Sequence, residues 1–351
     1  MYTKKDIKKA SNLNSAMILF FLGSVTLISF AYEPLTRLFV NETSPYYDSV
    51  YTLIAYTLQY IIGLGGALLI FYSTKTGKEV KKERPLLAKP KMPASWIFRH
   101  IIICFFLTYS VVYASSFLFA ILENLTGIKL NSPDFTAKDN VISRIANVAG
   151  LMFFAPIFEE TFFRGSVLRS NLRFGKWSMV IVSGIFFGLW HMNLSQMLYA
   201  SAMGIYAGFV YAKTRSLIPT LIIHFTFNTI GTIQSIFAGS VDLENVSFGS
   251  SAIQDYIRLI PLELLGLLII MLILTGLILF IIELVNHPES YKLDDETEKT
   301  DGYSTEDEIN AVQPENKMSG AKLFAVYLSA PVTLTTLILL FSLTILTSLV
   351  L

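Results

Sequence analysis

Residues 151–164 read Leu-Met-Phe-Phe-Ala-Pro-Ile-Phe-Glu-Glu-Thr-Phe-Phe-Arg. In this stretch two adjacent carboxylates and a guanidinium follow directly on an apolar run of the kind that crosses a membrane. A charge inside the hydrocarbon layer is costly unless it is paired or faces a wet cavity, so ionisable residues there mark a functional site. The stretch therefore predicts a membrane-embedded helix that carries part of a site, with partners from elsewhere in the chain.

The composition of the whole chain indicates the same class of protein. Of its 351 residues, 53% are hydrophobic and 15% are charged, whereas soluble domains carry roughly a quarter charged residues. Several apolar runs reach the length of about 20 residues that a membrane helix needs, and they are continuous rather than alternating, which excludes a transmembrane barrel. We expect an all-α, polytopic transmembrane helical bundle of about eight or nine spans in a lipid bilayer. The net charge of +1 and the lack of a nucleic-acid motif predict no nucleic-acid partner.

The apolar runs and the polar stretches between them divide the chain into five regions. These are three spans with a basic loop in residues 1–140, a four-helix core in 141–240, an eighth span in 241–285, an acidic linker in 286–320 and a C-terminal apolar helix in 321–351. The linker holds ten acidic residues and three lysines, a composition typical of disorder. The first apolar run follows four lysines as a signal peptide does, but its length favours an uncleaved first helix.

Basic residues predict the orientation in the membrane. They gather at the N-terminus and in residues 73–99, 164–176 and 213–216. Alternation through nine spans puts all four stretches on one side, and loops rich in Lys and Arg stay in the cytoplasm. The sequence therefore predicts a multi-pass protein of the cell membrane with a cytoplasmic N-terminus.

Few polar residues remain inside the predicted spans. Glu160 and Arg164 are four residues apart in the favourable acid-before-base order, so on a helix they can pair. Glu159 then points about 100° away and is left unpaired. His224 and Asn228 are also four apart and share one helix face. His191 lies in an earlier predicted span, at about residues 177–192.

These residue types together suit the activation of water. Glu159 could act as a general base, His191 and His224 could position the water or bind a metal, and Asn228 could donate to a developing oxyanion. Glu159, His191 and His224 are ligands of the kind that a divalent metal such as zinc prefers, but the spacing of zinc proteases (H-E-x-x-H) is absent and leaves the metal open. Each residue alone also has a plainer interpretation, as an interhelical hydrogen-bonding group or a structural ion pair.

The order of these residues resembles the signature of a known family. The three motifs are Glu159-Glu160-xxx-Arg164, Phe187-xxx-His191 and His224-xxx-Asn228. They are similar to those of the CPBP (CAAX protease and bacteriocin-processing, also called Abi) family of intramembrane proteases. The resemblance covers about residues 141–240.

The resemblance implies a membrane-embedded endopeptidase that acts on a membrane-associated peptide or protein. Glu159 would activate the water, and His191, His224 and Asn228 would complete the site. Glu160 and Arg164 would have supporting roles. Members of the family are described both as metalloproteases and as glutamate-dependent proteases, so the resemblance leaves the metal open as well.

Two other functions compete with proteolysis. The same fold could serve as a non-catalytic membrane scaffold or a bacteriocin-immunity-type protein. A proton-coupled transporter would also hold buried carboxylates and histidines, but it would need inverted repeats and broken helices, and the sequence shows no internal repeat.

Spacing within the core gives two further expectations. Gly184-xxx-Gly188 and Gly204-xxx-Gly208 are small-residue patterns that predict close packing of two consecutive helices. At about 1.5 Å per residue, His191 lies about 20 Å from the cytoplasmic start of its helix, whereas His224 lies only about 10 Å into its own. Residues that share a site should lie at one depth, so the sequence leaves this difference unexplained.

Overall fold

The computed structural model describes residues 2–130, 148–238, 252–293 and 318–350. Throughout these residues the secondary structure is helical and contains no strand. The first part comprises α1 (Lys4–Phe39), α2 (Tyr47–Thr57), the π-helix η1 (Leu58–Leu64), α3 (Gly65–Ser73), α4 (Lys75–Lys82) and α5 (Ala94–Thr126). The middle part comprises η2 (Gly150–Phe154), α7 (Ala155–Phe162), η3 (Phe163–Leu168), α8 (Arg169–Asn171), η4 (Leu172–Phe174), α9 (Lys176–Trp190), α10 (Leu194–Thr214) and α11 (Leu217–Ala238). The last part comprises α12 (Ala252–Asn286), η5 (Pro288–Tyr291), α14 (Gly320–Leu328) and α15 (Pro331–Val350).

Long apolar helices make the chain a polytopic membrane protein. Five helical stretches of the described chain are long and apolar enough to cross a bilayer: Lys4–Phe39, Tyr47–Ser73, Ala94–Thr126, Leu259–Asn286 and Pro331–Leu349. Helix α9 is a shorter apolar helix. The predicted all-α bundle is confirmed, while the number of spans stays a prediction.

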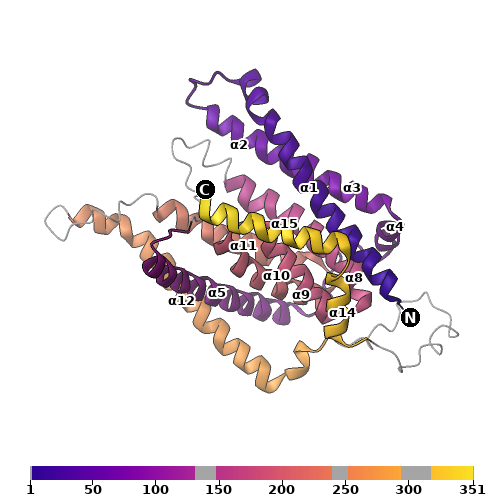
Figure 1. Ribbon diagram of the computed structural model, residues 1–351. Helices are drawn as coiled ribbons and strands as arrows, with labels where there is room; N and C mark the ends of the chain where they lie inside the picture. The colour runs from indigo at the N-terminus through magenta and orange to yellow at the C-terminus, as the bar shows by residue number, and fades with distance from the viewer. Residues whose placement is uncertain (1, 131–147, 239–251, 294–317, 351) are drawn as a thin grey trace.

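The helices of the middle part form the centre of the bundle (Figure 1). Helix α10 packs against α9 and α5, and α5 packs against α12. On another side α1 packs against η1, α14 and α15, and α15 also contacts α9 and α10. Segments from both ends of the chain therefore enclose the central helices.

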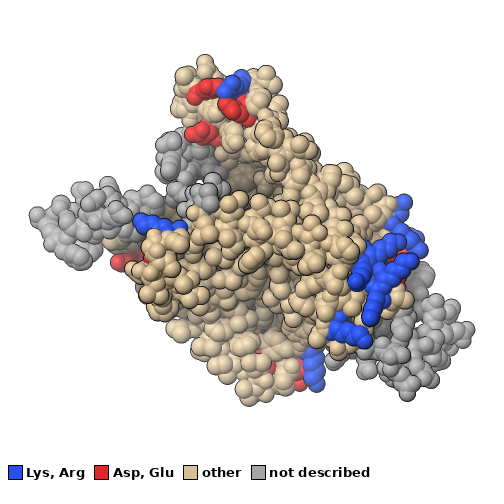
Figure 2. Space-filling model, viewed as in Figure 1, with Lys and Arg blue, Asp and Glu red and all other residues tan. Residues whose placement is uncertain are grey.

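Basic side chains gather at the end of the molecule that holds α4 and the N-terminus (Figure 2). Stretches that are far apart in sequence therefore share one side, as the distribution of Lys and Arg predicts. The cytoplasmic location of that side stays a prediction.

Glycines bring α9 and α10 close together, as the small-residue patterns predict. A Cβ atom added at Gly204 would lie 3.0 Å from the Cα of Gly184. One added at Gly188 would lie 1.9 Å from Ser201 Oγ and 2.4 Å from the carbonyl oxygen of Met197. The two helix backbones are therefore almost in contact, and these positions have no room for a side chain.

We expect Gly188→Ala to lower the stability of the protein by about 1–3 kcal/mol, because the added methyl group forces the two helices apart. The matched control is Gly266→Ala in α12, where an added Cβ meets nothing within 4 Å and alanine is the better helix former. Thermal unfolding in detergent checks both variants. Equal midpoints for the two would contradict the close packing.

Three regions differ from the sequence-based expectations. The C-terminal apolar region is two helices, α14 and α15, because the chain turns at Ser329 and Ala330 before Pro331 starts a new helix. Most of the basic stretch 164–176, expected as a cytoplasmic loop, continues the helix from α7 as far as Phe174 and buries the side chain of Arg164. The start of the linker is ordered at η5, where Trp177 Nε1 donates to the carbonyl oxygen of Tyr291 at 3.2 Å. Its predicted disorder over residues 294–317, like the predicted start of the fourth span near residue 141, lies outside the described residues.

Candidate active site

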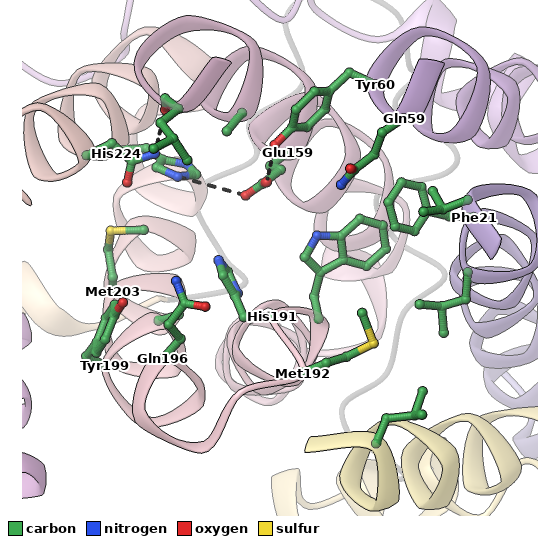
Figure 3. Close-up of a pocket in the computed structure, with 18 of the residues that line it drawn as sticks. Phe21, Gln59, Tyr60, Glu159, His191, Met192, Gln196, Tyr199, Met203 and His224 are labelled. Atoms are coloured by element: carbon green, nitrogen blue, oxygen red, sulfur yellow. Dashed lines mark hydrogen bonds and ion pairs between the residues drawn. The ribbon is translucent and has the colours of Figure 1, made fainter. Parts of the chain in front are cut away.

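A cavity of about 850 Å³ lies among the central helices and the segments that enclose them. Its walls come from α1, η1, η2, α7, the connection between α9 and α10, α10, α11 and α15. Its polar lining includes Gln59, Tyr60, Glu159, His191, Gln196, Tyr199, His224 and Asn228. Glu159, His191 and His224 point into the same space (Figure 3). The four residues expected at the centre of the site, Asn228 among them, therefore line one cavity.

Glu159 reaches the cavity from the middle of α7 and faces two different groups. Tyr60 donates its hydroxyl hydrogen to Glu159 Oε1 at 3.2 Å. The other oxygen, Oε2, lies 3.9 Å from His224 Nε2, which is too far for a direct hydrogen bond and suits a bridging water. Glu159 is 6% exposed, so its carboxylate is shielded from bulk solvent yet accessible from the cavity.

Glu160 points away from the cavity and is neutralised by Arg164. Its Oε1 lies 3.0 Å from Arg164 Nη1, and both side chains are fully buried. Arg164 Nη2 also donates to the carbonyl oxygen of Gly204 at 3.1 Å. The pairing inferred from the spacing of four residues is thus present, and it leaves Glu159 as the carboxylate that faces the cavity.

The same Glu160 oxygen also orients His224, a contact that the sequence does not reveal. His224 Nδ1 lies 3.0 Å from Glu160 Oε1. A carboxylate oxygen accepts, so Nδ1 is the donor in this contact. His224 therefore turns Nε2 towards Glu159.

His191 lies immediately after α9 and is oriented in the same sense. Its Nδ1 lies 2.9 Å from the carbonyl oxygen of Phe187, and since a carbonyl can only accept, Nδ1 is the donor and Nε2 is left for the cavity. The ring of Phe187 separates the groups: its centroid lies 5.1 Å from that of His191 and 5.5 Å from that of His224. Phe187 also packs under the Arg164 guanidinium at 4.5 Å. The aromatic residue of the second motif thus positions both imidazoles.

Helix α15 holds the short connection that carries His191. Met192, the next residue, has a left-handed backbone with φ of 48°. Its carbonyl oxygen accepts from Thr347 Oγ1, and the backbone N–H of Leu194 donates to Ser348 Oγ at 2.8 Å. The C-terminal helix therefore satisfies the backbone groups that this unusual turn leaves without helical partners.

Asn228 lines the cavity and also forms a hydrogen bond with the backbone. Its Nδ2 donates to the carbonyl oxygen of Leu151 at 2.8 Å. Leu151 belongs to the π-helix η2, a kind of widened turn that occurs frequently at functional sites. One amide hydrogen of Asn228 is thereby used, and the second remains for a ligand in the cavity.

The structure explains why His191 and His224 share a depth. Glu159 and His191 lie 16 residues before and 16 residues after Gly175, where the chain turns between two antiparallel helical segments. Helix α11 does not start at the level of that turn. Its first residue, Leu217, lies beside Gly165 in η3 and donates its N–H to the carbonyl oxygen of Leu86 at 2.8 Å. The shorter count from Leu217 to His224 therefore reaches the same level.

The donor groups do not converge in the manner of a metal site. Within the described ranges, no group of three or more His, Cys, Asp or Glu side chains lies close enough together to hold a metal ion. Both imidazoles have Nε2 available, but with Glu159 they line the cavity without meeting at one point.

Sequence reasoning missed the residues that complete the cavity from outside the core. Tyr60 and Gln59 come from η1, and Leu339 and Leu343 come from α15. Tyr60 lies 99 residues before its partner Glu159, in an apolar run without charges. No local spacing links the two, so only the three-dimensional packing reveals the contact.

The fold and the cavity define a class: a helical membrane protein with an acid–imidazole site enclosed among its helices. A family model described as Type II CAAX prenyl endopeptidase, Rce1-like, matches residues 141–230. This match confirms the resemblance to the CPBP (CAAX protease) family that the three motifs carry. Comparison with curated proteins and with solved structures found no match. The segments α1, η1 and α15, which complete the cavity, lie outside the matched residues.

Proposed function

We propose that the protein is an intramembrane endopeptidase that hydrolyses a peptide bond of a membrane-associated protein or peptide. The observation that carries the proposal is the division of roles between the adjacent carboxylates. Glu160 is neutralised by Arg164 outside the cavity, whereas Glu159 lines the cavity and faces Nε2 of His224. A carboxylate so placed is suited to take a proton from water.

In the proposed reaction Glu159 accepts one proton from a water molecule, and the hydroxide oxygen attacks the carbonyl carbon of the scissile bond. The remaining hydrogen of the water is donated to Nε2 of His224, which orients the water, and His191 turns its own Nε2 into the same cavity. The second amide hydrogen of Asn228 stabilises the oxyanion of the tetrahedral intermediate. Glu159 then returns its proton to the amide nitrogen as the C–N bond breaks, so the products are a carboxylic acid and an amine.

Cleavage assays on the purified protein test this proposal. The protein is reconstituted with candidate membrane-anchored peptides, and mass spectrometry identifies products that together exceed the substrate by one water. We expect cleavage by the wild type and none by Glu159→Ala. Cleavage that Glu159→Ala leaves intact would contradict the assignment of the base.

Chelation separates the proposed mechanism from that of a metalloprotease. Since the donor groups do not form a metal site, we expect the rate of peptide cleavage to be unchanged by a zinc chelator. A zinc protease assayed in the same detergent provides the positive control. If the chelator abolished cleavage and added zinc restored it, the metal-independent mechanism would be contradicted. Glu159, His191 and His224 would then be the expected metal ligands.

A further inference from the structure

The orientation of the Glu159 carboxylate is set by only a few contacts. The terminal torsion of a glutamate side chain is broad, so the plane of its carboxylate rotates readily unless one oxygen is held. Oε1 accepts the hydroxyl hydrogen of Tyr60 at 3.2 Å, and Oε2 faces His224 Nε2 at 3.9 Å. The bond from Tyr60 therefore fixes the plane of the carboxylate and keeps the second oxygen turned towards the imidazole.

Tyr60 is itself held firmly, as a group that positions another must be. Its side chain is 5% exposed. Its ring centroid lies 5.7 Å from that of Phe158 and 6.1 Å from that of Tyr56, which stacks on it. A phenol has only two side-chain torsions, so this packing leaves its hydroxyl little freedom to leave the carboxylate.

The backbone around Tyr60 is unusual in a way that aims the side chain. Tyr60 lies in the π-helix η1, which interrupts an otherwise α-helical span between α2 and α3. Such widened turns occur frequently at functional sites, because the extra residue redirects the side chains that follow it. Gly63 lets this segment approach α1 closely, since a Cβ there would meet Val25 at 3.1 Å and Phe21 at 3.2 Å.

We infer that Tyr60 is a positioning residue for Glu159, supplied by a span outside the segment that matches the protease family. By donating to Oε1, its hydroxyl holds Oε2 in the direction from which the water is deprotonated. The inference rests on the proposed function, in which Glu159 is the base. It extends the active site from residues 141–230 to the second span of the chain.

Steady-state cleavage of a membrane-anchored peptide that the wild type cleaves tests the inference. Tyr60→Phe removes the hydroxyl and keeps the ring. We expect kcat to fall about 10- to 100-fold, since a hydrogen bond to a charged acceptor is lost, and KM to stay within about twofold because Tyr60 holds the base rather than the substrate. The matched control is Tyr56→Phe, one helical turn away, which we expect to leave both constants unchanged.

Two further measurements separate positioning from packing. The thermal unfolding midpoint of Tyr60→Phe should lie only a few degrees below that of Tyr56→Phe, because each keeps its ring and Tyr60→Phe loses one hydrogen bond. In a Glu159→Gln background, Tyr60→Phe should cause no further loss of kcat, because the base that it positions is absent.

The possible outcomes distinguish this inference from the proposed function. If Tyr60→Phe cleaves as fast as Tyr56→Phe while Glu159→Gln is inactive, only the role of Tyr60 is overturned. A raised KM with unchanged kcat also overturns it and makes Tyr60 a substrate-binding residue. If Glu159→Gln keeps the full kcat, the proposed function itself fails.

Discussion

Glu159→Gln is expected to lower the kcat of peptide cleavage by about 100- to 10,000-fold, the usual contribution of a general base. Glutamine has the shape of glutamate and can still accept the hydrogen bond that Tyr60 donates to Oε1, but it cannot take a proton from water. The free energy of unfolding should change by less than about 1 kcal/mol, because Glu159 takes no part in the Glu160–Arg164 ion pair. Single-turnover cleavage and thermal unfolding measure the two quantities.

Glu159→Asp provides the matched control for this experiment. Aspartate keeps the carboxylate but shortens the side chain by one methylene, which withdraws both oxygens from their partners. A displacement of about 1 Å can cost about 100-fold in rate, so we expect activity between that of the wild type and that of Glu159→Gln. Equal activities of the Gln and Asp variants near the wild-type rate would rule out Glu159 as the base.

The parts of the site that the sequence predicts correctly are those that depend on local helix geometry. Glu160 and Arg164 pair because residues four apart lie on one helix face. The close approach of α9 to α10 follows from the lack of side chains at Gly184, Gly188 and Gly204. These features need only the helical period and the size of the residues, and both are available in the sequence.

The distribution of Lys and Arg does not identify a loop correctly where the basic side chains are paired inside the protein. Arg164 and Arg169 look like the cytoplasmic flank of a span, yet they are 0% and 7% exposed. Arg169 Nε instead donates to Glu83 Oε2 at 3.0 Å, a partner far away in sequence. The rule that basic residues mark a loop assumes that they remain in water, and burial of Arg164 and Arg169 against carboxylate partners removes that condition.

Tertiary contacts decide the remaining features. The depth of His224 depends on where Leu217 starts α11, and that start depends on Leu86 in a distant loop. The turn after His191 depends on hydroxyl groups of α15, more than 150 residues further along the chain. Such contacts leave no periodic trace in the sequence, so the cavity could be predicted from its motifs but its walls could not.

Arg164→Met is expected to lower the free energy of unfolding by about 3–5 kcal/mol, because it leaves the carboxylate of Glu160 buried and uncompensated. Arg164 is fully buried, pairs with Glu160 at 3.0 Å and donates to the carbonyl oxygen of Gly204 at 3.1 Å. Methionine keeps much of the apolar volume over the ring of Phe187. The loss of stability therefore reflects the missing charge more than a change in packing. Unfolding by denaturant in detergent measures the change.

The exposed pair Glu33–Arg37 provides a matched control, since it has the same residues in the same order four apart on a helix. Its side chains are 58% and 53% exposed, and water screens an exposed pair so that it contributes little to stability. Arg37 also pairs with Glu42, which is 55% exposed. Arg37→Met should therefore be nearly neutral. If the two methionine variants lost equal stability, burial of the Glu160–Arg164 pair could not be the cause of the loss.

The double variant Glu160→Gln/Arg164→Met tests the same argument from the other side. Removing both charges leaves no buried carboxylate without a partner, so part of the stability lost in Arg164→Met should return. Activity should not return with it, because His224 Nδ1 then lacks the carboxylate that fixes its tautomer. Recovery of stability without recovery of kcat would show that the pair has two separable roles. Arg164 neutralises the second carboxylate beside the base, and Glu160 orients the imidazole of His224 that faces Glu159.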